Sequence, residues 1–468
     1  DWSSDVCSSD LTIIAMGNAT SFNATGLFGG TAYDFYVYAQ NSYCIGGPLY
    51  SSALFGSQST NACSGLTGIV PIGPGQPNNA TGFTSLTNAM NFMASNGLIG
   101  STILELQPTY VGNSSVETFP IVVSNFPCMG PAKTLTIRPA ASVGSALTIG
   151  SSNTTATIDI NGANYLVIDG RPGGLGTNKF LVITDSSTTA AAAGNAILMR
   201  NDASNDTLKF LDIRSANQNA ATASVVVAAG SIPGALAIGT TTGANGNDNN
   251  VINTCDIHSL ASSGNLGVCI YAGNGTADGA VSNNDNNTIT NCNLFDFFLA
   301  TAASAAIDIV NSNNNYTITN NKVYETFTCN YAAGTQTVRG FWITPNASGS
   351  ITSASGYNIS GNFIGGANAS GTGTYTMTGT AAYSYNAMDI FVGFGTATSV
   401  QNNTVTKMNL TGGFSTNNFF GINPVSKKSV LISSQSLSEV ITNLKNELLK
   451  LLNILKISGL YLISFFIP

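Results

Sequence analysis

Short apolar runs alternate with Asn-rich segments along most of the chain, and one segment recurs in nearly constant form. Asn-Thr-Ile-Thr-Asn-Cys-Asn-Leu at 287–294 returns as Tyr-Thr-Ile-Thr-Asn-Asn-Lys-Val at 316–323 and as Tyr-Asn-Ile-Ser-Gly-Asn-Phe-Ile at 357–364. Further copies, the first of them the weakest, lie at 207–213, 251–257 and 399–405. We call this recurring segment the Asn phrase. Its copies share one order of residues: an apolar residue, two polar residues, Asn or Cys, any residue, and a second apolar residue. Self-similarity at a period of about 20–50 residues indicates a solenoid.

Each of the clearer copies follows a second apolar strand, and the loop between the two varies in length while the phrase does not. For example, Gly340-Phe-Trp-Ile-Thr344 precedes 357–364. That combination is expected when strands stack in register and loops grow outward. Asn suits the tight bend inside the phrase because it tolerates the left-handed conformation. We therefore predict an all-β fold, a right-handed parallel β-helix over 81–424, with the phrases stacked on one edge.

The Asn or Cys position of the phrase is predicted to form a buried structural ladder, because stacked amides can hydrogen-bond to the coils above and below. Its members are Cys255, Cys292, Asn321, Asn362 and Asn403. Neighbours in the stack would lie roughly 4.8 Å apart. Cys255 and Cys292 are then either disulfide-bonded or a pair of small buried thiols, and the second alternative is favoured.

The remaining segments predict smaller elements. Residues 64–80 are rich in Pro and Gly and read as a linker, and Thr84 to Asn96 reads as a short helix that covers the first coil. From 425 to 468 the chain becomes rich in Lys and Leu, and Ser436-x-x-Glu439 is a capping box. This predicts a helical tail, with three interpretations open: an amphipathic cap, a membrane-surface helix, or sequence read out of frame.

Composition excludes several classes of function. Charged residues make up 8% of the chain and the net charge is −7, which gives no basic footprint for nucleic acid. The eight Cys form no CxxC or Cys/His cluster and His258 is the only His, so zinc sites and imidazole-based triads are not expected. No apolar run predicts a transmembrane helix. We expect a monomer without a cofactor.

Residues 12–63 carry a first resemblance. The segment Leu27-Phe-Gly-Gly-Thr-Ala-Tyr33 and the alternating strand after it resemble the tyrosine-corner region of fibronectin type III domains, over about the last half of such a domain. In secreted bacterial versions one Cys follows this strand and another closes the domain. Cys44 and Cys63 occupy those places, so the resemblance implies a disulfide between them. Residues 1–11 resemble a translated sequencing-adapter remnant and are set aside; with no Met start and no visible signal peptide, we expect a fragment.

A second resemblance covers residues 80–424. The motifs are Phe83-Thr-Ser-Leu-Thr-Asn-Ala, the run from Ile158-Asp-Ile-Asn-Gly to Arg171-Pro-Gly-Gly174, and Asn201-Asp-Ala-Ser-Asn-Asp-Thr-Leu208. They resemble the β-helix region of large surface proteins that Gram-negative gliding bacteria export by the type IX system. The resemblance implies pectin-lyase-like architecture and a secreted or cell-surface location. It implies no particular enzymatic activity.

Stacking of the copies brings one group of ionisable residues together. Asp212 would lie over Asp256 on the outer face, and two residues further on Arg214 would lie over His258. A lyase needs a base beside a uronate, and a hydrolase needs two carboxyl groups about 5–9.5 Å apart. This patch is the catalytic candidate. The competing and favoured interpretation is a solvated face whose polar residues have no common task.

A second stack would place Asp248 over Asp285, each in an Asn-rich turn four residues before its phrase. Stacked carboxylates with Asn carbonyl oxygens are a candidate Ca²⁺ site, because Ca²⁺ takes six to eight oxygen ligands. No EF-hand or nonapeptide calcium motif is present, which favours solvated turns.

Two hypotheses of function follow. The first is a secreted, adhesin-like scaffold that binds glycans or other surface components without catalysis, favoured by uniform coils and scarce charge. The second is a polysaccharide lyase or glycoside hydrolase acting on an acidic polysaccharide.

Overall fold

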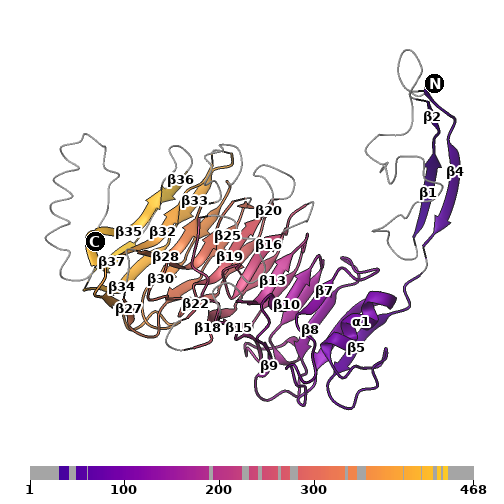
Figure 1. Cartoon of the computed structure of the whole chain (residues 1–468), viewed down its shortest axis with the longest axis horizontal. Helices are drawn as coiled ribbons and strands as arrows, with labels where there is room; N and C mark the ends of the chain where they lie inside the picture. Colours follow the sequence, from indigo (N-terminus) through magenta and orange to yellow (C-terminus); the bar gives the residue numbers. More distant parts are fainter. Residues whose placement is uncertain are drawn as a thin grey trace.

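Coils of three strands, one strand in each of three parallel sheets, build the described part of the chain from Ile121 onward (Figure 1). Two strands at 66–72 and 98–106 precede them and begin sheet 2. The computed structural model describes residues 31–41, 49–60, 62–188, 193–223, 231–240, 245–261, 265–274, 283–311, 313–332, 336–344, 355–393, 395–412, 414–424, 430–433 and 436–440. Each coil passes from sheet 1 to sheet 2 to sheet 3, and every pairing within these sheets is parallel. The fold is the expected right-handed parallel β-helix.

Sheet 1 has nine strands: β7 (Ile121–Ser124), β10 (Ala156–Asn161), β13 (Asn195–Arg200), β16 (Leu236–Thr240), β19 (Val268–Asn274), β23 (Ser304–Ile309), β28 (Gln336–Ile343), β32 (Tyr383–Ile390) and β35 (Phe414–Pro424). Sheet 2 has eleven: β5 (Leu66–Ile72), β6 (Leu98–Leu106), β8 (Leu135–Pro139), β11 (Leu166–Asp169), β14 (Thr207–Lys209), β17 (Val251–Asn253), β21 (Thr288–Thr290), β25 (Thr317–Thr319), β29 (Asn358–Ser360), β33 (Thr398–Gln401) and β36 (Val430–Ser433).

Sheet 3 comprises β9 (Leu147–Ser151), β12 (Leu181–Asp185), β15 (Leu211–Ser215), β18 (Asp256–Ser259), β22 (Asn293–Phe295), β26 (Lys322–Tyr324), β30 (Phe363–Ile364), β34 (Thr404–Leu410), β31 (Tyr375–Gly379) and β27 (Cys329–Tyr331), and β37 (Ser436–Val440) pairs with β34. Between strands of the solenoid lie the 3-10 turn η1 (Pro172–Gly174) and the paired short strands β20 (Asn284–Asp285) and β24 (Asn313–Asn314), which belong to none of these sheets.

The Asn phrase sets the register of the solenoid. Its first apolar residues face each other in one unbroken interior column of sheet 2: Leu208, Ile252, Ile289, Ile318, Ile359 and Val400. The residue just before the ladder position is left-handed, with φ from 53° to 68° at Phe210, Thr254, Asn291, Asn320, Gly361 and Asn402. This single left-handed residue turns the chain from sheet 2 into sheet 3, which is why the phrase favours Asn there.

The ladder positions lie directly after that bend and are buried. The Asn321 Nδ2 donates to Asn362 Oδ1 at 3.0 Å, and the Asn362 Nδ2 donates to Asn403 Oδ1 at 2.9 Å. The backbone N–H of Cys292 donates to Asn321 Oδ1 at 2.9 Å. Cys255 and Cys292 are buried and carry free thiols.

Two more amide ladders occupy the bend between sheets 1 and 2, outside the constant positions of the phrase. Asn247 Nδ2 donates to Asn284 Oδ1 at 3.0 Å, and Asn284 Nδ2 donates to Asn313 Oδ1 at 3.2 Å. The backbone N–H of Asn250 donates to Asn287 Oδ1 at 2.9 Å. The solenoid is therefore held by side-chain amides at two of its corners.

Helix α1 (Leu86–Asn96) covers the first coil, close to the expected span, with Leu86, Ala89, Met90 and Met93 buried. Ser85 caps it by accepting a hydrogen bond from the Asn88 N–H. The buried Glu117 carboxylate accepts the N–H groups of Leu86 and Thr87 at 2.7 and 2.8 Å. An anion at this position satisfies free helix N–H groups and complements the helix dipole.

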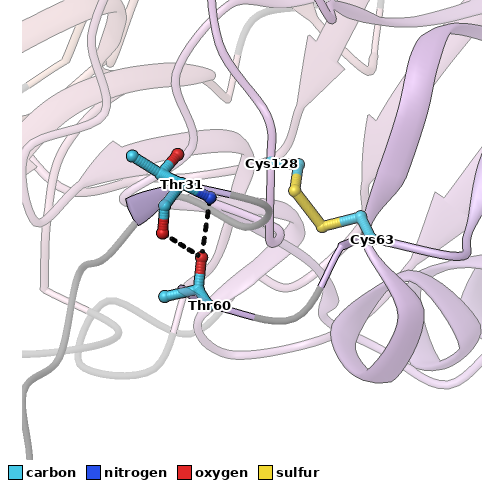
Figure 2. The surroundings of a disulfide bond; sticks show 4 residues. All are labelled: Thr31, Thr60, Cys63 and Cys128. Atoms are coloured by element: carbon cyan, nitrogen blue, oxygen red, sulfur yellow. Dashed lines mark hydrogen bonds between the residues drawn. A yellow bond between two sulfur atoms is a disulfide. The ribbon is translucent and has the colours of Figure 1, made fainter. Parts of the chain in front are cut away.

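The predicted disulfide is wrong: Cys63 pairs with Cys128, with a Cα–Cα distance of 6.4 Å (Figure 2), and Cys44 lies outside the described residues. The linker expected at 64–80 is also partly wrong, because 66–72 is strand β5, which pairs with β6. Both errors have one cause. Cys63 lies at the start of the solenoid and not at the end of the preceding module. Its partner, Cys128, is in the turn after β7, and in this turn the Pro127 carbonyl accepts the Leu98 N–H.

The N-terminal segment is described in part. Strand β1 (Ala32–Val37) pairs antiparallel with β4 (Leu54–Ser59), and β2 (Gln40–Asn41) pairs with β3 (Leu49–Tyr50). Thr60 Oγ1 bonds to the backbone of Thr31 beside this hairpin (Figure 2). The likeness to half of a fibronectin module stays a prediction, and residues 1–11 lie outside the described range.

The helix expected from Ser436 is not present over the described part of the tail. Residues 436–440 form β37, which pairs in parallel with β34, and 430–433 form β36 beside β33. One more coil satisfies backbone groups that the last strands would otherwise leave unpaired, and that outweighs the capping box. In the described ranges, no helix is long and apolar enough to span a bilayer.

Asn321→Leu tests the ladder. The change leaves the Cys292 N–H and the Ile289 carbonyl without their side-chain partner in the interior. We expect a loss of roughly 1–3 kcal/mol in the free energy of unfolding, measured by chemical denaturation. Ser360→Ala, on the outer face of β29, is the control and should change it little. An unchanged midpoint for Asn321→Leu would refute the ladder.

Peptide mapping without reduction tests the corrected disulfide. A proteolytic digest should yield a linked pair of peptides that contain Cys63 and Cys128 and that separate on reduction. A linked Cys44–Cys63 pair would restore the expectation from the sequence.

Candidate functional site

The outer face of sheet 3 brings the four predicted residues together. Asp212 pairs in register with Asp256, and Arg214 pairs with His258, across the neighbouring strands β15 and β18. Alternation along β15 turns Leu211 and Ile213 into the core and leaves the polar side chains outside. The stacking expected from the phrase therefore places these four as predicted.

Asp212 is held by Arg214 and His258. Arg214 donates to both of its carboxylate oxygens, Nε to Oδ1 at 2.8 Å and Nη2 to Oδ2 at 2.5 Å, and His258 Nε2 lies 3.1 Å from Oδ1. Burial alone would raise the pKa of Asp212, but the hydrogen bonds and charges of Arg214 and His258 outweigh it and lower the pKa to about 2. Asp212 is a permanent anion at neutral pH and a poor proton acceptor.

Asp256 has a different set of partners, one of which the sequence did not suggest. Lys179, in the segment between η1 and β12, places its Nζ 2.5 Å from Asp256 Oδ1, although 77 residues separate the two. Asn293, the next residue in the same column, donates from Nδ2 to the same oxygen at 2.6 Å. Lys179 lies in a segment that does not repeat, so the phrase could not reveal it.

An aromatic stack continues the column of His258. The rings of His258 and Phe295 are 4.2 Å apart and nearly parallel, and Phe295 and Tyr324 follow at 4.8 Å. The rings stack face to face, so the faces between them are covered by the neighbouring ring. This stack stabilises the outer face between coils, and the ring faces that meet within it are not open to a ligand.

The Asp248 and Asp285 pair lies in the turns that lead into sheet 2. Asp248 Oδ1 accepts the backbone N–H of Asp285 at 2.6 Å, and Asp285 pairs in register with Asn314. Burial raises the pKa of Asp248 to about 6, helped by the charges of Asp285 and Asp202 against that hydrogen bond. In the part of the chain that the structure describes, no group of three His, Cys, Asp or Glu residues is arranged to hold a metal ion.

A second polar cluster on the outer face of sheet 1 was missed. Asp308, Trp342 and Asp389 form one column across β23, β28 and β32, and Arg339 faces Asn386 nearby. The signal was an apolar-x-apolar strand centre, as in Ile307-Asp-Ile309 and Met388-Asp-Ile390, whose middle residue points outward. Because the middle residue is not constant, the repeat did not reveal it.

The charges of this cluster are unequal. Asp308 is fully buried, its Oδ2 accepts the Thr222 N–H at 2.9 Å, and its Oδ1 has no partner among the described residues. Burial raises the pKa of Asp308 to about 8, against the Thr222 hydrogen bond and the charge of Arg339. Asp308 is therefore a neutral acid at pH 7, beside a guanidinium.

Arg339 links the other members. Its Nε donates to Asp389 Oδ2 at 3.0 Å, and its guanidinium lies 3.6 Å from the centre of the Trp342 ring. Asn386 Nδ2 donates to the same Asp389 oxygen at 3.1 Å. Two carboxyl groups in different environments are what acid–base chemistry requires, but Asp308 lies beneath the segment that holds Thr222 and is closed to solvent.

Comparison with known proteins finds only distant structural likenesses. No protein-family model and no curated protein matches the chain. Among solved structures, it is similar to an alginate lyase from Paenibacillus sp. str. FPU-7 (14% identity, 75% of this chain and 97% of the other, TM-score 0.32) and to the pectate lyase Pel9A (11%, 82% and 85%, 0.38). It is also similar to PfbA, a surface adhesin of Streptococcus pneumoniae (13%, 75% and 78%, 0.34). Likenesses this distant carry nothing about the chemistry of this chain.

Asp308→Asn tests the buried acid through pH. Folding raises this pKa from 3.8 to about 8, so the stability that the protonated group gives is lost as the pH rises through that window. Relative to the wild type, the variant should gain up to about 1.4 kcal/mol per pH unit between about pH 5 and pH 8, measured by denaturation. Asp34→Asn, at an exposed site, is the control. A difference that is constant with pH would contradict the assignment.

Proposed function

We propose that this chain is an extracellular β-helix scaffold that binds glycans along its side without cleaving them. The observation that carries the proposal is the closed pairing on sheet 3. Asp212 is shared by Arg214 and His258, and Asp256 by Lys179 and Asn293. A general base needs a free lone pair within reach of a substrate proton. Here the carboxylates are already used to hold the coils together.

The outer face of sheet 2 is the surface that we assign to binding. Its outward residues are uncharged and polar over four successive strands, and they stand in two columns: Thr288, Thr317, Asn358 and Ser399, and Thr290, Thr319, Ser360 and Gln401. They are half-buried or exposed. We call this surface the polar strip. Hydroxyl and amide groups repeated about every 4.8 Å can pair with the hydroxyls of an extended polysaccharide.

The disulfide supports an extracellular location. Cys63–Cys128 lies at the start of the solenoid, and disulfides persist in oxidising compartments such as the cell exterior. A protein in that location meets glycans of its own surface and of neighbouring cells.

A panel of cellulose, xylan, alginate and polygalacturonate tests binding and cleavage together. We expect retention on at least one polymer, with no new reducing ends and no unsaturated products. Thr288→Val with Thr317→Val removes two hydroxyls of the polar strip at constant shape and should weaken binding several-fold, about 1 kcal/mol for the lost hydrogen bonds. Thr136→Val, on the same face of β8, is the control.

Two different results would contradict the proposal. Binding that is unchanged in the double variant would move the ligand away from the polar strip. Cleavage that disappears in Asp256→Ala with His258→Ala would make the sheet 3 patch an active site and replace the proposal.

The second candidate, a hydrolase or lyase, is favoured by one observation: the neutral acid Asp308 lies near the Arg339–Asp389 ion pair on sheet 1. It requires the segment around Thr222 to move away from Asp308. Cleavage of any panel polymer that is lost in Asp308→Asn, while the fold is retained, would establish it.

A further inference from the structure

Three side chains of complementary chemistry meet on sheet 3. Lys179 Nζ and Asn293 Nδ2 both contact one oxygen, Asp256 Oδ1, at 2.5 and 2.6 Å. An amine, a carboxyl group and a primary amide are thus held in one place by three separate segments. The amine and the amide nitrogen surround the same carboxylate oxygen, so the two nitrogens are no more than about 5 Å apart.

This arrangement contains every group needed to make an amide bond between side chains. We propose that Lys179 and Asn293 form an intramolecular amide cross-link, with Asp256 transferring the protons. The proposal is independent of what the protein binds.

The reaction balances without any added reagent. Asp256 takes a proton from the Lys179 ammonium, which leaves a neutral amine with a lone pair. The amine attacks Cγ of Asn293, the new C–N bond forms, and the bond from Cγ to Nδ2 breaks. After the attack the nitrogen of Lys179 still carries a second proton to lose. Asp256 returns the first proton to the departing nitrogen and then transfers the second one to it, so this nitrogen leaves as an ammonium ion. The product is a secondary amide, and the carboxylate of Asp256 is regenerated.

The surroundings favour this chemistry in the folded chain. The side chains of Lys179 and Asp256 are 18% and 27% exposed, so much of the ion pair is removed from water. Lys suits this role because its amine can act as a nucleophile once it has passed a proton to a carboxylate, which the guanidinium of Arg does not. The folded structure also fixes the groups in contact, which replaces an encounter in solution.

The cross-link would join distant parts of the solenoid. Lys179 precedes β12, and Asn293 begins β22, with β15 and β18 between them in sheet 3. A covalent bond across these coils would act along the axis of the solenoid, where these strands of sheet 3 are otherwise joined by hydrogen bonds, ion pairs and side-chain packing.

Mass spectrometry of the purified, reduced full chain tests the proposal. We expect a mass lower than the sequence mass by one ammonia molecule, and a branched peptide that joins Lys179 to Asn293 after proteolysis. Lys179→Arg keeps a cation for Asp256 and removes the nucleophile, so it should have its full sequence mass and unfold at a lower temperature than the wild type. Asp256→Asn should also lose the mass deficit.

Lys322→Arg is the matched control. Lys322 is the neighbour of Asn293 on the other side of the same column, and its Nζ contacts the Ala369 carbonyl. This variant should retain the deficit. Full mass in the wild type, with Lys179 and Asn293 recovered in unmodified peptides, overturns the proposal. A deficit of one water molecule with a bond from Lys179 to Asp256 overturns it equally, because the carboxyl group would then be the acceptor.

Discussion

The hydrogen bond that crosses from one coil to the next at the bend between sheets 2 and 3 is the constraint on which the rest of the structure depends. Asn321 and Asn362 each accept the backbone N–H of the preceding coil and donate to the next amide. Because the bend is left-handed at a single residue, the strand after it starts at a fixed position. Every outward side chain of sheet 3 is then stacked on the equivalent residue of the neighbouring coil.

This constraint explains what the sequence could predict. The bend recurs as Asn or Gly in the later copies, and the ladder position after it recurs as Asn or Cys. The phrase therefore predicts both the interior column of Ile289 and Ile318 and the pairing of Asp212 with Asp256. Loops do not share the repeat. Lys179 and the partner of Cys63 lie in such segments, and spacing along the chain contains no information about which coil they reach. Residues 436–440 form a strand because the open edge of β34 lies beside them, and the local helix signals in the sequence contain no information about that edge.

The two polar clusters treat charge in opposite ways. On sheet 3, Asp212 keeps its charge because Arg214 and His258 compensate for its burial. On sheet 1, the carboxyl group of Asp308 has one backbone N–H and the more distant charge of Arg339. These do not offset the effect of burial, so the pKa of Asp308 is raised and the group stays protonated at neutral pH. In the first arrangement, the hydrogen bonds and charges of neighbouring side chains offset the free-energy cost of removing the carboxylate from water. The second removes the charge and leaves stability dependent on pH.

The first coil also has a consequence for the molecule as a building block. A stack of parallel strands has two ends, and each end is a template on which another stack could add, as at the tip of a growing fibre. Helix α1 lies over one of these ends, and the carboxylate of Glu117 anchors the start of the helix from the following coil. A helix in this position covers strand edges that would otherwise be open to another copy of the chain.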